Sequence, residues 1–308
     1  LADCSDKSRI RCKMLVDSCI APSAVCAIEM PSLALRIATP IPLIWLVKRL
    51  EICSPAASSF ALLMRKPEAK RSIDVLRPLF KADVFAKEID RFNFHNIFEN
   101  LIFNPFEGQI DTGNMMQALL KEAVSKDILI LNQQNVISFQ DLNDKVEVVT
   151  NETSFVTNKL LFATNGFASE LTKNQVQPAR AQVLITKPIE NLDIKGTFHL
   201  DKGYYYFRNI GNRILFGGGR NLDFKGETTT DLAQSKIIQD KLEELLKTVI
   251  LPNQKIEIEH RWSGIMGVGN NKNPIVEQLS NNVYCGVRMG GMGVAIGSLI
   301  GKELADLV

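Results

Sequence analysis

Hydrophobic and polar positions follow a regular pattern only from about residue 70 onward. Apolar residues at helical spacing predict helices over residues 72–88, 112–125 and 230–249, and Asp111 or Thr112 would cap the second of these. The inward positions that this spacing predicts are, in chain order, Phe80, Val84 and Phe85; Met115, Met116, Leu119 and Leu120; and Leu232, Ile237, Leu242 and Leu246.

Short apolar runs bounded by turn residues predict strands between and after these helices. They span residues 128–131, 135–139, 146–150, 154–157, 159–163, 178–188, 203–209, 213–218, 255–261 and 282–287. The hairpin turn that joins the runs 135–139 and 146–150 falls at Asp144. Helices and strands in this succession predict a mixed α/β chain with an antiparallel sheet in its middle.

The last fifty residues join an apolar strand to a glycine cluster. Residues 282–287 run into Arg288-Met289-Gly290-Gly291-Met292-Gly293, after which a helix is expected. Gly293, Gly297 and Gly301 recur at four-residue spacing, which predicts a flat helix face that packs on a sheet. Free N–H groups at a helix start attract negative charge, and glycine lets a flat ring approach the backbone. The pattern fits a phosphate or flavin site, and equally a packed strand–loop–helix without a ligand.

Two further motifs lie just upstream, Trp262-Ser263-Gly264 and Asn273-Pro274-Ile275-Val276. Together with the glycine cluster they resemble the carboxy-terminal segment of the D-amino-acid-oxidase-like family of FAD-dependent oxidoreductases, which includes glycine and sarcosine oxidases. The resemblance extends over about residues 73–308. It implies a Rossmann-like FAD-binding domain from residues 71–166 plus 264–308, incomplete at its start. An antiparallel substrate domain, residues 167–263, would roof the flavin.

The resemblance also implies where FAD is held. Ala163-Thr164-Asn165-Gly166 matches the family's second dinucleotide-contacting turn, usually Ala-Thr-Gly, with Asn165 inserted. The N–H groups around residues 291–294 would stabilise charge on the reduced flavin. The implied cofactor contacts are Val136, Thr164, Asn165, Gly166, Gly264, Gly290, Gly291, Met292, Gly293 and Val294. Relatives with covalent flavin carry a cysteine near the Trp-x-Gly segment; this chain has none there, so non-covalent FAD is expected.

A tyrosine-rich segment is the candidate substrate surface. In Tyr204-Tyr205-Tyr206-Phe207-Arg208, strand alternation places Tyr204, Tyr206 and Arg208 on one face. An arginine beside tyrosines can clamp a carboxylate, although an exposed sheet face with a salt bridge would have the same pattern. Two nearby motifs match the family. Arg180 lies in a Pro-x-Arg-Gly-Gln-like segment in which Ala181 replaces the glycine, and Gly217-Gly218-Gly219-Arg220 resembles a strand-end turn that is interpreted as mainly structural.

Met266 departs from the family pattern. Relatives that oxidise amino acids tend to have Trp-x-Gly-x-Arg, in which the arginine takes the substrate carboxylate, and Met266 stands at that position. Either Arg208, Arg288 or Arg261 takes over this task, or the substrate is not an α-amino acid. The expected catalytic residues are therefore Arg208, Tyr204, Tyr206 and Arg288.

The first 70 residues do not follow the family pattern. All 19 glycines lie at or after Gly108, so the Gly-x-Gly-x-x-Gly turn that receives the FAD pyrophosphate is missing. This segment also holds five of the six cysteines and shows neither helical nor strand periodicity. We therefore expect residues 1–70 to be an anomalous segment rather than native family sequence, as a frame error, a mis-joined exon or a wrong start would produce.

Composition limits the remaining choices. Thirty-six basic and 34 acidic residues give a net charge of +2, so no basic face for nucleic acid is expected. The apolar run 37–47 is interrupted by Pro40 and Pro42 and is shorter than the ~20 residues of a membrane span. No Cys-x-x-Cys pair occurs, so no metal site is expected. A cytoplasmic protein acting on a small amine or amino acid is the first interpretation.

Two alternatives remain open at this stage. Without the glycine-rich pyrophosphate turn, the chain would be a non-catalytic or truncated remnant that binds FAD weakly or not at all. With Met266 in place of the arginine, it would be a flavoprotein acting on a 2-hydroxy acid.

Overall fold

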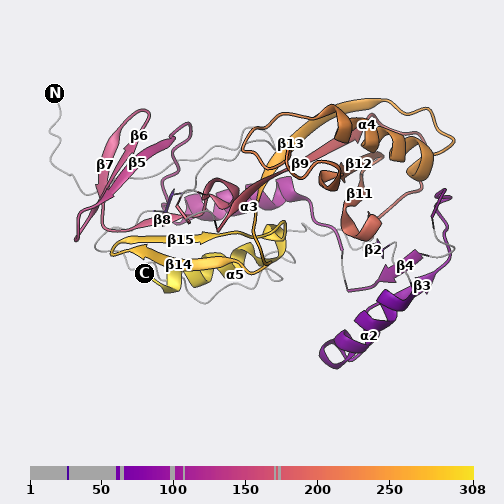
Figure 1. Cartoon of the computed structure of the whole chain (residues 1–308), viewed down its shortest axis with the longest axis horizontal. Coiled ribbons are helices and arrows are strands. Elements are labelled where there is room, and N and C mark those ends of the chain that lie inside the picture. The colour runs from indigo at the N-terminus through magenta and orange to yellow at the C-terminus, as the bar shows by residue number, and fades with distance from the viewer. Residues whose placement is uncertain are drawn as a thin grey trace. The chain divides into compact units, whose positions relative to one another are not determined.

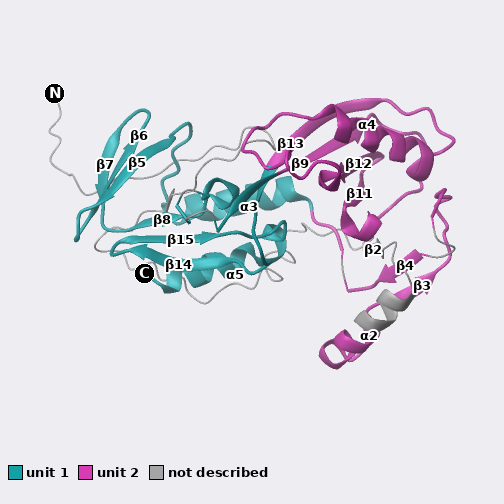
Figure 2. Cartoon of the chain, in the orientation of Figure 1, with its two compact units in different colours: residues 1–52, 111–179, 265–308 teal, residues 53–110, 180–264 magenta. Residues whose placement is uncertain are grey.

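A computed structural model describes residues 26–27, 60–62, 66–97, 101–106, 108–169, 171–172 and 175–308 (Figure 1). The chain divides into two compact units (Figure 2). Unit 1 comprises residues 1–52, 111–179 and 265–308, and unit 2 comprises residues 53–110 and 180–264. Most of the segment 1–70 lies outside the described residues. The expectation that this segment is anomalous is therefore not tested by the structure.

This division differs from the expected domain boundaries in two places. Residues 71–110 were expected in the cofactor domain but belong to unit 2, because β4 (Leu101–Asn104) pairs with β2 (Phe60–Leu62) in the sheet of that unit. Residues 167–179 were expected in the substrate domain but belong to unit 1. Whether the two units are the FAD-binding and substrate domains stays a prediction.

The described part of unit 1 contains two sheets. A four-stranded sheet has the order β1-β8-β15-β14, in which β15 is parallel to β8 and antiparallel to β14. A separate antiparallel sheet has the order β5-β6-β7. The strands are β1 (Cys26–Ala27), β5 (Val136–Asp141), β6 (Val146–Thr150), β7 (Ser154–Thr157), β8 (Leu160–Phe162), β14 (Ile275–Ser280) and β15 (Val283–Val287). Every residue of β15 is buried, as its apolar sequence predicts.

Helix α3 (Thr112–Ser125) begins at the expected cap. The Asp111 carboxylate accepts a hydrogen bond from the Asn114 N–H at 2.9 Å, which satisfies one free donor of the first turn. The predicted inward stripe is wrong in part, because only Met115 is buried while Met116 and Leu119 are 42% and 40% exposed. The strand expected over residues 128–131 is also wrong, since this segment has no regular secondary structure.

Helix α5 (Gly293–Asp306) lies along β14 and β15 (Figure 1). Ile300 and Leu304 are its buried residues, and they pack on Gly286 of β15. A Cβ built on Gly286 would lie 3.0 Å from Leu304 Cδ2, so the strand carries the small residue that brings helix and sheet together. The glycine face of the helix does not make this contact: no described residue lies within 4 Å of a Cβ built on Gly301.

Unit 2 is built on an eight-stranded sheet in the order β13-β9-β12-β11-β10-β2-β4-β3. The pairs with a defined register are antiparallel except β10 with β2. Strands not yet given are β3 (Ala86–Glu88), β9 (Gln177–Thr186), β10 (Thr197–Leu200), β11 (Tyr205–Ile210), β12 (Arg213–Gly218) and β13 (Ile258–Val268). The expected mixed α/β class with antiparallel sheets is confirmed.

The helices of unit 2 end or begin at other residues than expected. Helix α2 (Lys66–Phe80) stops where Lys81 takes a left-handed φ of 52°, so β3 occupies the end of the predicted helix. Helix α4 (Lys236–Leu245) continues into a π turn, Leu246–Ile250. Ile238 is 1% exposed and Ile237 is 53% exposed, so the inward position is one residue later than predicted.

The core of unit 2 combines α4 with an aromatic cluster on the sheet. Phe198 and Phe207 stack with ring centroids 4.7 Å apart, and Phe94 meets both rings edge-on. Leu242 and Leu246 of the helical segment are fully buried in the same core. None of the helices in the described part of the chain combines the length and apolarity needed to cross a bilayer.

Candidate functional site

Three segments of unit 1 meet at a junction in which glycines allow close backbone approach. They are the turn 164–166, the end of β13 at 265–268, and the loop 288–292 (the glycine loop). A Cβ built on Gly166 would lie 2.7 Å from the Met266 carbonyl oxygen, and one built on Gly267 would lie 2.6 Å from Asn165 Oδ1. Side chains do not fit at such distances, so glycine at both positions lets the turn lie against the strand.

Asn165 connects the turn to the glycine loop. Its Oδ1 accepts a hydrogen bond from the Met289 N–H at 3.0 Å, while the Gly290 N–H donates to the Gly267 carbonyl at 2.9 Å. A backbone N–H can face only the oxygen of the amide, so Nδ2 of Asn165 points away from Met289. No acceptor for Nδ2 occurs among the described residues. The residue that sequence comparison identified as an insertion therefore holds the loop in place.

The glycine loop leads into α5 with unused backbone donors. Gly290 and Gly291 have φ of 58° and 83°, a region that suits glycine. Within the described residues the N–H groups of Gly291, Gly293 and Val294 donate to no acceptor. The first turn of α5 contains no acidic residue, so the positive end of the helix dipole is not offset by a local carboxylate.

These residues fit the flavin end of FAD. Thr164 Oγ1 is buried without a hydrogen-bond partner in the part of the chain that the structure describes, which is the state expected of a group that bonds a ligand. Nothing described lies within 4 Å of a Cβ built on Gly290, so one side of the loop is open to a flat ring. The glycine-rich turn that receives the pyrophosphate in this family has no counterpart in residues 1–107, which contain no glycine.

Two of the predicted cofactor residues are not brought to this junction by any described contact. Val136 is half-buried in β5, where it pairs with Thr150 of β6. Gly264 lies in the part of β13 that belongs to unit 2, with no described atom within 4 Å of a built Cβ. Their roles in FAD binding stay predictions.

Arg288 is 9% exposed, and its guanidinium is occupied within unit 1. Its Nε donates to the Asn273 carbonyl at 2.8 Å, Nη1 to the Gln175 carbonyl at 3.2 Å and Nη2 to Asn271 Oδ1 at 3.1 Å. Arg288 therefore fixes the segment that follows β13. Its predicted role in binding the substrate carboxylate stays untested, and these three hydrogen bonds disfavour it.

The tyrosine-rich strand of unit 2 alternates as expected from Tyr205 onward. Tyr205 and Phe207 are buried, while Tyr206 and Arg208 lie on the other face. Tyr204 is not part of the strand, because residues 201–203 form a 3-10 turn that closes with the Tyr204 N–H on the Asp201 carbonyl at 3.0 Å. Strand pleating therefore does not place Tyr204 beside Tyr206, which is a correction.

Two groups on this strand have a defined environment. Burial raises the pKa of the Tyr206 phenol. Arg208 donates from Nη1 to the Ile110 carbonyl at 2.7 Å, so part of its guanidinium is already occupied in unit 2. The roles of Tyr204, Tyr206 and Arg208 at a substrate stay predictions.

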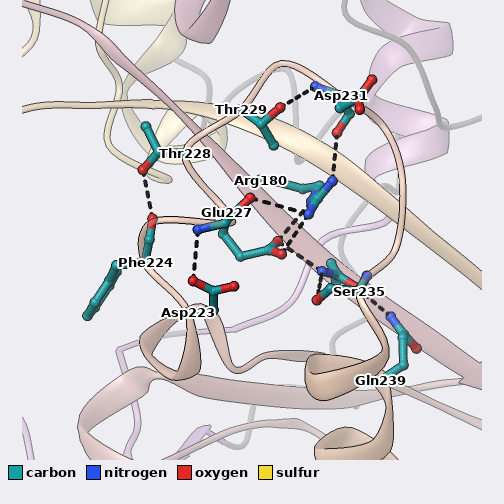
Figure 3. A network of polar contacts seen from close by, with 11 residues as sticks. Arg180, Asp223, Phe224, Glu227, Thr228, Thr229, Asp231, Ser235 and Gln239 are labelled. Atoms are coloured by element: carbon teal, nitrogen blue, oxygen red, sulfur yellow. Dashed lines mark hydrogen bonds and ion pairs between the residues drawn. The ribbon is translucent and has the colours of Figure 1, made fainter.

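A buried ion pair organises the loop after β12. Figure 3 shows the Glu227 carboxylate facing the Arg180 guanidinium, with distances of 2.9 Å from Nε to Oε2 and 2.7 Å from Nη2 to Oε1. Gln182 also donates to Glu227 Oε2 at 2.9 Å. Burial alone would raise the pKa of Glu227, but the hydrogen bonds from Arg180 and Gln182 and the charge of Arg180 lower it.

The same network reaches helix α4. Gln182 Oε1 accepts from the Ser235 N–H at 3.0 Å and from Gln239 Nε2 at 3.1 Å. The family motif had singled out Arg180 without a role, and its partner Glu227 lies 47 residues away, where no local pattern identifies it. Among the described residues, no group of three or more His, Cys, Asp or Glu side chains could hold a metal ion.

Comparison with known proteins gives a consistent result. A family model described as FAD dependent oxidoreductase matches residues 49–307. The match begins about twenty residues before the resemblance found in the sequence, so it includes residues 49–70 of the segment expected to be anomalous. The probable oxidoreductase OrdL of Haemophilus influenzae is 22% identical over 228 residues, which are 69% of this chain and 50% of OrdL. The chain thus spans about half the length of this curated relative.

Several solved structures have a fold similar to that of this chain. L-proline dehydrogenase from P. horikoshii superposes with a TM-score of 0.69 at 18% identity, covering 85% of this chain and 74% of that one. Glycine oxidase from Bacillus cereus superposes with a TM-score of 0.68 at 15% identity, covering 87% and 77% of the two chains. At these identities the likeness establishes the architecture.

Proposed function

Since this chain belongs to the family of FAD-dependent oxidoreductases, we propose that it oxidises a small amine or amino acid with non-covalently bound FAD. The observation that supports this proposal is the junction in unit 1, where Asn165 holds a glycine loop with unused N–H groups at the start of α5. Two of the similar structures are named for enzymes of proline and glycine. Whole-protein activity is a proposal, because the chain matches half of its curated relative.

FAD would supply the redox chemistry by accepting a hydride from the substrate carbon. The chain's own residues would bind and orient. The N–H groups of Gly291, Gly293 and Val294, which donate to no described acceptor, would hold the flavin end of FAD and would stabilise negative charge on it. Thr164 Oγ1 is a further unpaired buried group for the cofactor. Asn165 keeps the loop that carries these donors in position.

A flavoprotein acting on a 2-hydroxy acid is the second candidate. It stays open because Met266 departs from the Trp-x-Gly-x-Arg pattern of relatives that oxidise amino acids. A 2-hydroxy acid also carries a carboxylate, so Met266 alone does not favour it over an amino acid. Both candidates use the same loop, so only the substrate distinguishes them. A remnant that no longer holds FAD is the third candidate, supported by the missing glycine-rich turn before Gly108.

Anaerobic reduction of the flavin separates these candidates. The chain is loaded with FAD, freed of excess, and mixed with glycine, sarcosine, L-proline and simple primary amines, and in parallel with lactate and glycolate. The proposal expects an amine or amino acid to bleach the visible flavin bands while the hydroxy acids do not. Bleaching by the hydroxy acids alone would favour the second candidate, and protein that retains no flavin would favour the third.

A further inference from the structure

Arg220 in unit 2 has a guanidinium group that pairs with no carboxylate of the described residues. It opens the short 3-10 turn Arg220–Leu222 directly after the glycines that end β12, and its side chain is partly buried. Its Nε is buried without a hydrogen-bond partner among the described residues, and no ion pair with a described carboxylate exists. The guanidinium lies over the Phe224 ring, 5.0 Å from Cζ to the centroid. In Figure 3 this ring points away from the Arg180–Glu227 pair.

A partly buried guanidinium without an anion is costly, because burial removes water that would otherwise solvate the charge. Burial lowers the pKa of Arg220, and the charge of Glu227 opposes this shift. Glu227 does not neutralise it by direct contact, since both carboxylate oxygens accept from Arg180 and Oε2 also accepts from Gln182. The neighbouring Asn221 Oδ1 is likewise buried without a partner in the described residues. The turn therefore presents a donor on Arg220 and an acceptor on Asn221 that bond to no described residue.

The arginines that the sequence put forward as carboxylate ligands are occupied. Arg261 donates to Gln239 Oε1 at 2.8 Å and is paired with Glu243. Arg288 donates to three acceptors within unit 1, and Arg208 donates to the Ile110 carbonyl. Arg220, which the sequence pattern indicated as structural, differs from all three.

We propose that Arg220 binds the carboxylate of the substrate. The inference rests on the proposed function and narrows its substrate class to amines that carry a carboxylate. Guanidinium binds carboxylates through paired N–H donors, and Phe224 would hold its plane in a fixed orientation. Arg220 would thus set the specificity for substrates that carry a carboxylate.

The test compares acids with their amides on the FAD-loaded chain. Glycine and glycinamide, and L-proline and L-prolinamide, are assayed with the wild type and with Arg220→Met, Arg220→Lys and Arg91→Met. Arg91 is a matched control, because it also lies over a phenyl ring, 5.2 Å from that of Phe92, but is exposed. We expect Arg220→Met to lower the acid-to-amide ratio of kcat/KM by about 10- to 100-fold. The acid-to-amide ratio of Arg220→Lys should lie between those of the wild type and Arg220→Met, and the ratio of Arg91→Met should match that of the wild type.

A second readout does not depend on turnover. Phenylglyoxal modifies arginine, and peptide mass spectrometry measures how fast Arg220 is modified with and without each probe. Millimolar glycine or L-proline should slow modification of Arg220 and leave that of Arg91 unchanged, whereas the amides should protect neither. This readout keeps the inference testable if no probe reduces the flavin.

The two possible failures are distinguishable. If acids and amines bleach the wild-type flavin but Arg220→Met leaves the acid-to-amide ratio unchanged, the role of Arg220 is wrong and the proposed function stands. If nothing bleaches the flavin yet the acids protect Arg220, the carboxylate site stands and the proposed oxidation is wrong. Equal protection by acids and amides, or none, overturns the site.

Discussion

Asn165 offers the sharpest test of how the glycine loop is held. The change to alanine removes the acceptor of the Met289 N–H, which lies 3.0 Å from Oδ1. A partly buried N–H left without a partner costs about 1–2 kcal/mol. Asn165 also has a φ of 48°, and the left-handed region costs alanine about 1–2 kcal/mol, whereas asparagine adopts it more readily. Asn165→Ala should therefore destabilise unit 1 by about 2–4 kcal/mol.

Two further variants separate these contributions. Asn165→Gly tolerates the backbone angle but lacks the acceptor, so it should lose about 1–2 kcal/mol. Asn165→Asp keeps an acceptor oxygen and should stay closest to the wild type in stability. It also replaces the Nδ2 donor with a negative charge, so it should weaken FAD binding more than its stability suggests. The wild type and Asn165→Asp should therefore be the most stable, Asn165→Gly less stable, and Asn165→Ala the least stable.

Urea unfolding gives the free energies, and amide hydrogen exchange of a peptide containing Met289 reports the bond itself. The exchange measurement is needed because a chain of two units need not unfold in one step. Protection at Met289 should fall in the Ala and Gly variants and persist in Asp. The reasoning fails if Asn165→Ala unfolds at the wild-type urea concentration with Met289 protected as before.

Three other residues, Glu227, Cys285 and Gly217, test the rest of the structure. Glu227→Gln leaves Arg180 buried without its anion and should cost about 3–5 kcal/mol in urea unfolding. Because the pKa of Glu227 is below its ordinary value of 4.5, its contribution to stability is present above that value and is lost as pH falls through the lowered pKa, which a pH series of urea melts would show. Burial raises the pKa of Cys285 to about 11, so iodoacetamide at pH 8 should label it only after unfolding; rapid labelling of the native chain would contradict this. Gly217→Ala puts a Cβ 2.4 Å from Val183 Cγ1 and should cost about 1–3 kcal/mol, while the control Gly264→Ala, with no described atom near its built Cβ, should change stability little.

Local sequence patterns predicted the elements that are specified by nearby residues, such as a helix cap or an apolar run. The Asp111 cap located the start of α3, and the apolar run before the glycine cluster located β15. Helix α4 was predicted to start at residue 230 but begins at Lys236. The Ser235 N–H there is held by Gln182, a residue 53 positions away, which no periodicity reveals. In the first turn the inward residue is Ile238 rather than Ile237, while Leu242 and Leu246 are buried as predicted.

The candidate site was predictable as a set of motifs but not as a set of contacts. The turn around Thr164 and the glycine loop were found by resemblance, and the structure brings both to one junction. The contact that joins them, from Met289 to Asn165, spans 124 residues and depends on the tertiary fold. Arg288 was expected at the substrate because it precedes the glycines, yet its guanidinium reaches three acceptors that only the folded loop supplies.

The most direct test of the central claim is the flavin content of the purified chain. FAD is added, the excess is removed by gel filtration, and the visible absorption spectrum gives the flavin bound per chain, with Asn165→Ala measured alongside. The account predicts visible flavin bands at close to one FAD per wild-type chain and a lower content in the variant. A wild-type chain that emerges colourless would contradict the account and leave the remnant as the interpretation.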